Sequence, residues 1–250
     1  MKHNFKKTLA LLLMVALLPS LAVALSACGN DSELKWSFEL NEDGKSYTAT
    51  PDSKKYVFDE DAFRKYGEKH PDDYNALEKN RTELQEKALS NRNKVAKANV
   101  PAEYKGLPVT KVNTNFLYAF PNLKTITVSE KSEHFRGYNN VLYSKKGDII
   151  YFSADRKPGT DIAAIILYDN IKTIGDSAFS NYTVLPSIEI PYSVTSIGSY
   201  AFYGCINLTS IKYDGTTEQW QAIQFGENWN EGTGEYVVHC TDGTVAKTAR

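Results

Sequence analysis

The sequence predicts a mainly β repeat solenoid with parallel strands, an N-terminal β-hairpin cap and an α-helical insertion. Three observations support this prediction. Apolar residues in the C-terminal half recur with a period of 23 residues, apolar residues near the N-terminus alternate on one side of a turn signal, and the polar stretch between these regions has helical spacing.

The repeat is clearest in the segment 174–179 (IGDSAF), which recurs 23 residues later as 197–202 (IGSYAF). The same offset relates further apolar pairs: Ile171 with Val194, Leu185 with Leu208, Ile188 with Ile211, and Ile190 with Tyr213. A degraded earlier copy begins at Val109. Because one unit cannot bury its apolar face alone, we expect the units to stack and their strands to pair in a parallel sheet.

Within one unit, Leu208-x-x-Ile211-x-Tyr213 is the pattern of a leucine-rich repeat, whose units are about 20–29 residues long. Alternation along a strand places Ile211 and Tyr213 on the inner face and Lys212 on the outer face. Phe202 is expected to fill the interior of the coil. The predicted fold class is therefore a leucine-rich-repeat solenoid.

The segment 190–202 (IPYSVTSIGSYAF) closely resembles the BspA-type leucine-rich repeats of bacterial surface proteins. Three further segments are also similar to that family. Residues 100–110 resemble its opening segment, 141–151 a hairpin inserted between repeats, and 214–220 with 238–244 its closing segment. Phe116 and Leu117 depart from the pattern, which has Ala and Phe there, so a distorted first repeat is expected. The resemblance implies binding at a cell surface without a shared catalytic centre.

The N-terminus predicts export. Lys2, Lys6 and Lys7 precede an apolar run from Leu9 to Leu25, the pattern of a secretory signal. The run is shorter than the about 20 residues that span a bilayer. Leu-Ser-Ala-Cys at 25–28 resembles the lipobox of bacterial lipoproteins, which implies that Cys28 is lipidated and anchors the chain to a membrane. The alternative is an ordinary small-residue cleavage site with a chance cysteine.

The region before the repeats has two parts. Alternating apolar residues at 36–40 before the turn signal at 42–44 predict a hairpin, which we expect to cap the first repeat. Helical spacing follows from Asp59, with a break at 67–71 and a longer helix from about Asp72. The apolar stripe of the longer helix is thin, so this helix either leans on the flank of the solenoid or projects into solvent.

These observations divide the chain as follows: signal peptide (1–27), lipidated tether (28–33), β-hairpin cap (34–58), helical insertion (59–99), leucine-rich repeats (100–213) with an inserted hairpin near 141–152, and C-terminal closing segment (214–250).

Chemistry-bearing residues are sparse, and we expect neither an enzyme nor a bound cofactor. The formal net charge is −1 and no basic face stands out, which argues against nucleic acid as a partner. His239 and Cys240 have no further Cys or His at ligand spacing, so we interpret them as structural and expect no metal site. Cys205 is expected to be a buried thiol, although one disulfide between Cys205 and Cys240 is arithmetically open.

The candidate ligand surface is the outer face of the strands, where residues 23 apart should be lateral neighbours. One row contains Ile166, Glu189 and Lys212, joined by Thr127 unless the inserted hairpin separates the first strand. Ile166 and Tyr168 are the large apolar groups of this face, so they are the expected ligand anchors. The alternative is that both pack under the 141–152 hairpin.

Two functions are consistent with these patterns. The first is a lipid-anchored extracytoplasmic module on the outer face of a bacterial membrane that binds a protein or a glycan through the repeat surface, as in adhesion. The second is an accessory envelope lipoprotein in which the helical insertion contacts a partner and the solenoid is a scaffold.

Overall fold

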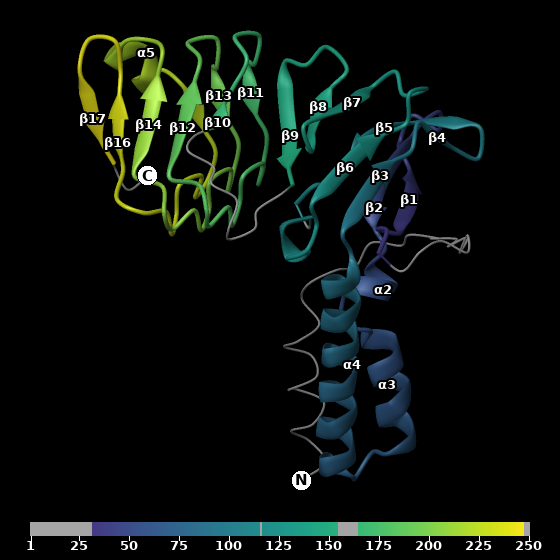
Figure 1. Ribbon diagram of the computed structural model, residues 1–250. Helices are drawn as coiled ribbons and strands as arrows, with labels where there is room; N and C mark the ends of the chain where they lie inside the picture. Colours follow the sequence, from purple (N-terminus) through teal and green to yellow (C-terminus); the bar gives the residue numbers. More distant parts are fainter. Residues whose placement is uncertain (1–31, 116, 155–164, 248–250) are drawn as a thin grey trace.

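The computed structural model describes residues 32–115, 117–154 and 165–247. The predicted signal peptide (1–27), Cys28 and most of the predicted tether (28–33) lie outside these residues, as does Phe116. The described residues confirm the predicted fold class: the chain winds into a solenoid whose coils each add one strand to a front sheet and one to a back sheet (Figure 1). Within the described parts, no helix is both long and apolar enough to cross a bilayer.

The front sheet has five strands in the order β10-β12-β14-β16-β17. Their bounds are β10 (Ile165–Ile166), β12 (Ser187–Ile190), β14 (Ser210–Tyr213), β16 (Val237–His239) and β17 (Thr244–Ala246). The first four are parallel, and Ile188 is paired with Ile211, so the sequence repeat of 23 residues is also the strand register. β17 pairs antiparallel with β16 and ends the sheet.

The back sheet has six strands in the order β15-β13-β11-β9-β8-β7. Their bounds are β7 (Phe135–Tyr138), β8 (Val141–Ser144), β9 (Ile149–Ser153), β11 (Thr173–Ile174), β13 (Ser196–Ile197) and β15 (Gln224–Phe225). β9, β11, β13 and β15 are parallel, whereas β7, β8 and β9 form an antiparallel meander. The expected hairpin near 141–152 is therefore β8–β9, and its second strand is part of the solenoid itself.

The core lies between the two sheets. Inward residues of the front sheet, such as Ile188 and Ile211, are fully buried, as is Phe202. Phe179 and Phe202 stack with ring centroids 5.3 Å apart, and Trp229 meets Phe202 edge-on at 6.1 Å. Each coil therefore contributes an aromatic ring to one continuous core.

The last coil is longer than the others. Ser210 of β14 pairs with Val237 of β16, 27 positions later in the sequence. The additional length includes α5 (Thr217–Gln221), where Thr216 and Gln219 form a reciprocal capping box. The predicted closing segment (214–250) thus contains a further coil as well as the terminal strand β17.

A second core belongs to the N-terminal part. It includes β1 (Trp36–Leu40), β2 (Tyr47–Pro51), β3 (Lys97–Val100), β4 (Glu103–Tyr104), β5 (Leu107–Val112), the 3-10 helix η1 (Leu117–Ala119) and β6 (Thr125–Val128). Tyr56 also belongs to it, as do Phe135, Leu142 and Phe152 from the meander. β1 and β2 are an antiparallel hairpin, β2 pairs parallel with β5, and β3 pairs parallel with β6. Leu117, which departs from the repeat pattern, is 1% exposed in this core.

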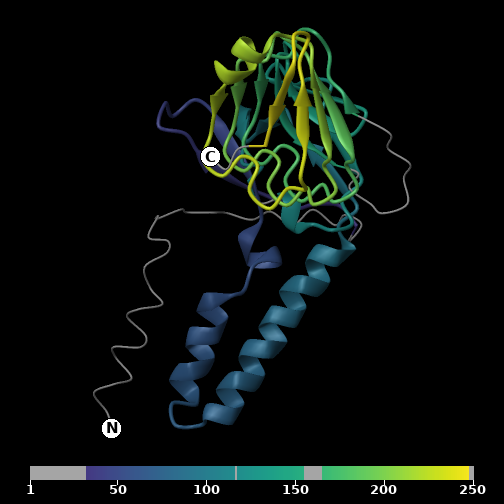
Figure 2. The same ribbon diagram turned by 90° about the vertical axis from the view of Figure 1, so that its left-hand side faces the viewer.

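The helices project away from the solenoid as a pair (Figures 1 and 2). They are α3 (Glu60–Lys69) and α4 (Tyr74–Lys94), preceded by the short α2 (Ser53–Tyr56). Of the two arrangements open from the sequence, projection is the one observed. The insertion ends earlier than residue 99, since Lys97–Val100 form strand β3.

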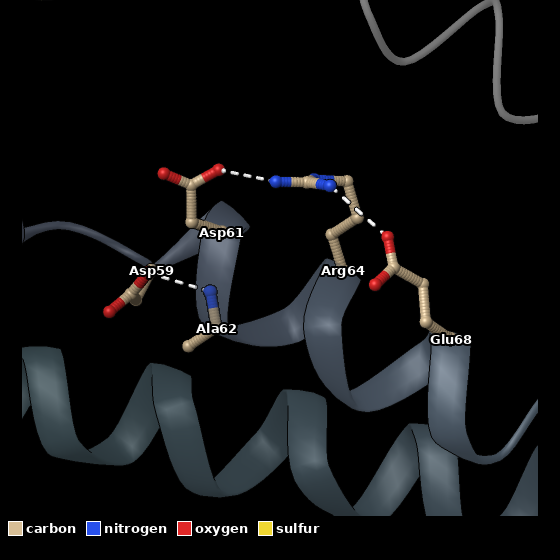
Figure 3. Close-up of polar contacts among 5 residues, drawn as sticks. All are labelled: Asp59, Asp61, Ala62, Arg64 and Glu68. Carbon is tan, nitrogen blue, oxygen red and sulfur yellow. Dashed lines mark hydrogen bonds and ion pairs between the residues drawn. The ribbon is translucent and has the colours of Figure 1, made fainter.

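Local polar contacts explain where these helices begin and why α3 tolerates solvent. The Asp59 carboxylate accepts a hydrogen bond from the backbone N–H of Ala62 at 2.9 Å, and Asp73 caps α4 through Ala76 in the same way. Arg64 pairs with Asp61 at 3.2 Å and with Glu68 at 3.1 Å, on the side of α3 that points away from α4 (Figure 3).

Candidate functional site

The outer face of the front sheet brings the predicted row together. Ile166 pairs with Glu189, Glu189 with Lys212, and Lys212 with His239. The predicted register of Ile166, Glu189 and Lys212 is confirmed by these pairs. His239 extends the row by one coil, which sequence reasoning missed because the last coil does not keep the 23-residue period.

Glu189 and Lys212 form the predicted ion pair, with Lys212 Nζ 3.2 Å from Glu189 Oε2 and 3.6 Å from Asp214 Oδ1. The hydrogen bond to Glu189, followed by the charge of Asp214, raises the pKa of Lys212 above its ordinary value. The Lys212 side chain remains 56% exposed. Solvent therefore screens the pair, which orients two charges on the surface more than it stabilises the fold.

Thr127 does not join this row. It lies on β6, whose described partner is β3, with Thr127 opposite Asn99. β3 and β6 form a two-stranded sheet separate from the front sheet, and the meander β7–β8–β9 comes between β6 and β10 in the chain. The inserted hairpin thus interrupts the series of strands after β6. Thr127 is excluded from the row, as expected for that case.

Tyr168 lies where the front sheet meets the β7–β8 turn. The residue is 50% exposed, and its ring centroid is 6.4 Å from that of Tyr138. A hydrogen bond with Tyr138 is the main cause that raises the pKa of Tyr168. Tyr168 thus agrees in part with each alternative. It contacts Tyr138 beside the inserted hairpin, and it is still half-exposed, as a ligand anchor would be.

A small cavity of about 200 Å³ opens beside Tyr168. Its wall includes Tyr138 and Tyr143 from the meander. It also includes Leu167 and Phe179 from the first complete coil, which is the coil that contains β10 and β11. Tyr138 and this cavity were missed at the sequence level. The sequence signal for this turn was the pair Asn139-Asn140 between two strand-like segments. In the structure both residues have positive φ (46° and 60°), as a two-residue hairpin turn requires.

The C-terminal half contains the cysteines whose pairing the sequence left open. Cys205 and Cys240 are both thiols, so the disulfide that the sequence left open does not link them. Cys205 is fully buried and its thiol donates to the Phe179 carbonyl oxygen at 3.1 Å. Burial, assisted by the charge of Asp242, raises the pKa of the Cys240 thiol and keeps it protonated.

Among the residues that the structure describes, no group of three or more His, Cys, Asp or Glu side chains is placed to hold a metal ion. Cys28, the predicted lipidation site, lies outside the described residues.

Three solved structures are similar to this chain in part. The first is a leucine-rich repeat protein from Eubacterium ventriosum, with 24% identity, a TM-score of 0.45, and coverage of 58% of this chain and 37% of that one. The second is the pneumococcal vaccine antigen PcpA, with 18% identity, a TM-score of 0.41, and coverage of 58% of this chain and 39% of that one. The third is a leucine rich cell surface protein from Faecalibacterium prausnitzii, with 20% identity, a TM-score of 0.32, and coverage of 53% of this chain and 55% of that one. The chain thus spans less than two thirds of each of these proteins.

No curated protein matches the sequence. Residues 158–230 match the family described as BspA type leucine rich repeat region (6 copies). This match includes β10 to β15 and the segment 190–202, on which the resemblance was based. The repeats at 158–230 therefore belong to the BspA-type leucine-rich repeats.

Proposed function

We propose that this chain is a lipid-anchored, extracytoplasmic binding module of a bacterial surface, which holds a protein or glycan ligand on the outer face of its front sheet. The observation that carries the proposal is the regular backbone register of Ile166, Glu189, Lys212 and His239 in the front sheet, with the half-exposed Tyr168 at its end. Lys212 and His239 are exposed and Glu189 is half-buried. A rigid parallel sheet presents such side chains at fixed spacing, which lowers the entropic cost of binding.

The BspA-type repeats at 158–230 support a surface role through the resemblance described above. The lipobox-like segment at 25–28 supports attachment through Cys28. Lipid attachment would make the protein anchored to a membrane rather than spanning it.

Capture from envelope and host-surface extracts by the chain from residue 29 onward tests the binding role. Ile166→Asp combined with Tyr168→Ser should abolish capture of the recovered ligand. Tyr74→Ser, which also replaces an exposed tyrosine by serine but on α4, should retain it. Tyr74 is 72% exposed and is the first residue of α4, a helix that projects away from the solenoid (Figure 1). Unchanged capture by the folded double variant would remove the front sheet as the binding surface.

The projecting helices favour a second candidate, in which α3 and α4 contact an envelope partner and the solenoid is a scaffold. Tyr74 and Leu89 of α4 are 72% and 49% exposed, which gives this pair of helices apolar contact points. Replacement of residues 59–90 by a short Gly-Ser linker separates the two ideas.

That replacement is feasible because the amide of Asn91 donates to the Lys55 carbonyl oxygen at 2.9 Å, so the two ends of the insertion are adjacent. It also retains β3, which a deletion of all of 59–99 would remove. Binding retained after the replacement favours the front sheet, and binding lost favours the helices.

A further inference from the structure

The cavity beside Tyr168 has a rim of two tyrosines from separate parts of the chain. Tyr138 ends β7 and precedes the tight Asn139-Asn140 turn, whereas Tyr168 follows β10. The two residues are 54% and 50% exposed, and their ring centroids are 6.4 Å apart. Each ring therefore keeps part of its surface open to a ligand while the other ring holds its position.

The floor of the cavity is apolar and belongs to the core. Ile150 is fully buried, Phe179 is 1% exposed and Leu167 is 7% exposed. Tyr143, which is 6% exposed, completes this floor from the meander. Core residues of this kind do not rearrange readily, so the shape of the cavity is preformed.

The polar groups of the wall are neutral. They comprise the Asn139 amide, the Ser153 hydroxyl and tyrosine hydroxyls, and the described wall contains no Asp, Glu, Lys or Arg. Arg136 lies behind this wall, with its guanidinium 5.5 Å from the centroid of the Tyr143 ring. A cationic ligand would therefore lose its hydration here without gaining an opposite charge, which is costly. Neutral hydrogen-bonding groups beside aromatic faces suit a ligand that has hydroxyl groups and an apolar C–H face.

The volume limits the size of that ligand. About 200 Å³ is below the about 300–1,000 Å³ of cavities that enclose drug-sized molecules, so a single ring is the unit that fits. A neutral pyranose combines this size with one C–H face and several hydroxyl groups.

We propose that the cavity between the β7–β8 turn and the first front strand binds one neutral pyranose unit of a glycan, with Tyr138 and Tyr168 stacking on the sugar and Asn139 as a hydrogen-bonding partner. The inference deepens the proposed binding function, on which it rests, by naming the ligand class and placing the sugar at the Tyr168 end of the front face.

The test uses the full chain, purified in a polyoxyethylene detergent rather than a glycoside detergent and immobilised on a sensor surface. The probes are methyl β-glucopyranoside, methyl β-galactopyranoside and N-acetylglucosamine, with glucosamine as the cationic counterpart. At least one neutral probe should bind at millimolar concentration, and N-acetylglucosamine should bind more tightly than glucosamine.

Tyr138→Ala and Tyr168→Ala should each weaken the binding of that probe by about tenfold or more. Tyr192→Ala, at a 62% exposed tyrosine outside the cavity wall, should change it by less than about twofold. Tyr168→Phe keeps the ring and should retain most of the affinity. Because Tyr138 and Tyr168 are half-exposed, all variants should melt at the temperature of the unchanged protein.

Absence of binding by every neutral probe would overturn the inference, and so would binding that survives both alanine substitutions. The proposed function is tested by a different experiment, the capture of a ligand through Ile166 and Tyr168, and Tyr138 is not part of that front-sheet row. A protein ligand captured through Ile166 and Tyr168, in a chain that binds none of the neutral probes, would leave the proposed function standing and remove the pyranose site.

Discussion

Phe179 and Phe202, which are 23 residues apart in the sequence, stack almost parallel inside the solenoid, with 8° between their ring planes. Both rings come from the same position of consecutive repeats, next to Ala178 and Ala201, which are fully buried. A small residue beside each phenylalanine allows the ring to enter the interior. The sequence repeat therefore becomes a ladder of rings that connects one coil to the next.

The first prediction concerns this ladder. Phe202→Ala should lower the free energy of unfolding by about 3–5 kcal/mol, because it removes a fully buried ring and leaves a cavity between Phe179 and Trp229. Thermal and urea denaturation measure the loss. Lys212→Ala is the control on the outer face and should barely change the stability. Equal effects of the two variants would contradict the assignment of inner and outer faces.

The second prediction concerns glycines at coil contacts. A Cβ at Gly198 would lie 2.6 Å from the backbone nitrogen of Asp176 in the preceding coil. Gly198→Ala should therefore destabilise the protein by about 1–3 kcal/mol, since two backbones must move apart.

Gly67→Ala is the matched control for Gly198→Ala. Gly67 lies in α3, and its added Cβ would make an ordinary contact of 3.5 Å with Leu77 Cδ2. This variant should stabilise the protein by about 0.5–1 kcal/mol, because alanine favours helix. Denaturation in urea gives both values, and a Gly198→Ala variant at least as stable as the unchanged protein would show that close approach does not govern Gly198.

The third prediction concerns alkaline pH. Burial raises the pKa of Tyr143, and the neighbouring Tyr168 adds to this effect. Above the ordinary tyrosine pKa of about 10, the unfolded chain loses a proton that the folded chain still holds, so the free energy of unfolding falls as pH rises through this window. Tyr143→Phe should make that fall less steep, as measured by urea denaturation at increasing pH. An unchanged slope would mean that Tyr143 ionises as easily in the folded protein.

The fourth prediction concerns attachment. Cys28→Ser should move the protein from the membrane fraction to the soluble fraction, because the lipid on Cys28 is the proposed anchor. Fractionation after a high-salt wash measures this, with Cys240→Ser as the control that should remain membrane-bound. A Cys28→Ser protein that still sediments wholly with membranes would contradict the lipoprotein proposal.

Sequence patterns predicted the solenoid, its inward residues and its strand register correctly, because all three follow from local alternation and a constant repeat length. Ile188 and Ile211 face inward and Glu189 and Lys212 are paired outward, as a period of 23 requires. Helix starts near Asp59 and Asp73 were also readable, since an N-cap contact needs only neighbouring residues.

Tertiary structure alone decided the features that depend on residues far apart in the chain. β9 joins the back sheet, the helices project instead of packing on the solenoid, and the last coil brings His239 beside Lys212 across an irregular spacing. Tyr138 and Tyr168, separated by 30 positions, share one cavity only because the meander and the first complete coil meet there. A periodic pattern determines neighbours at its own period, whereas contacts across an interruption depend on the path of the whole chain.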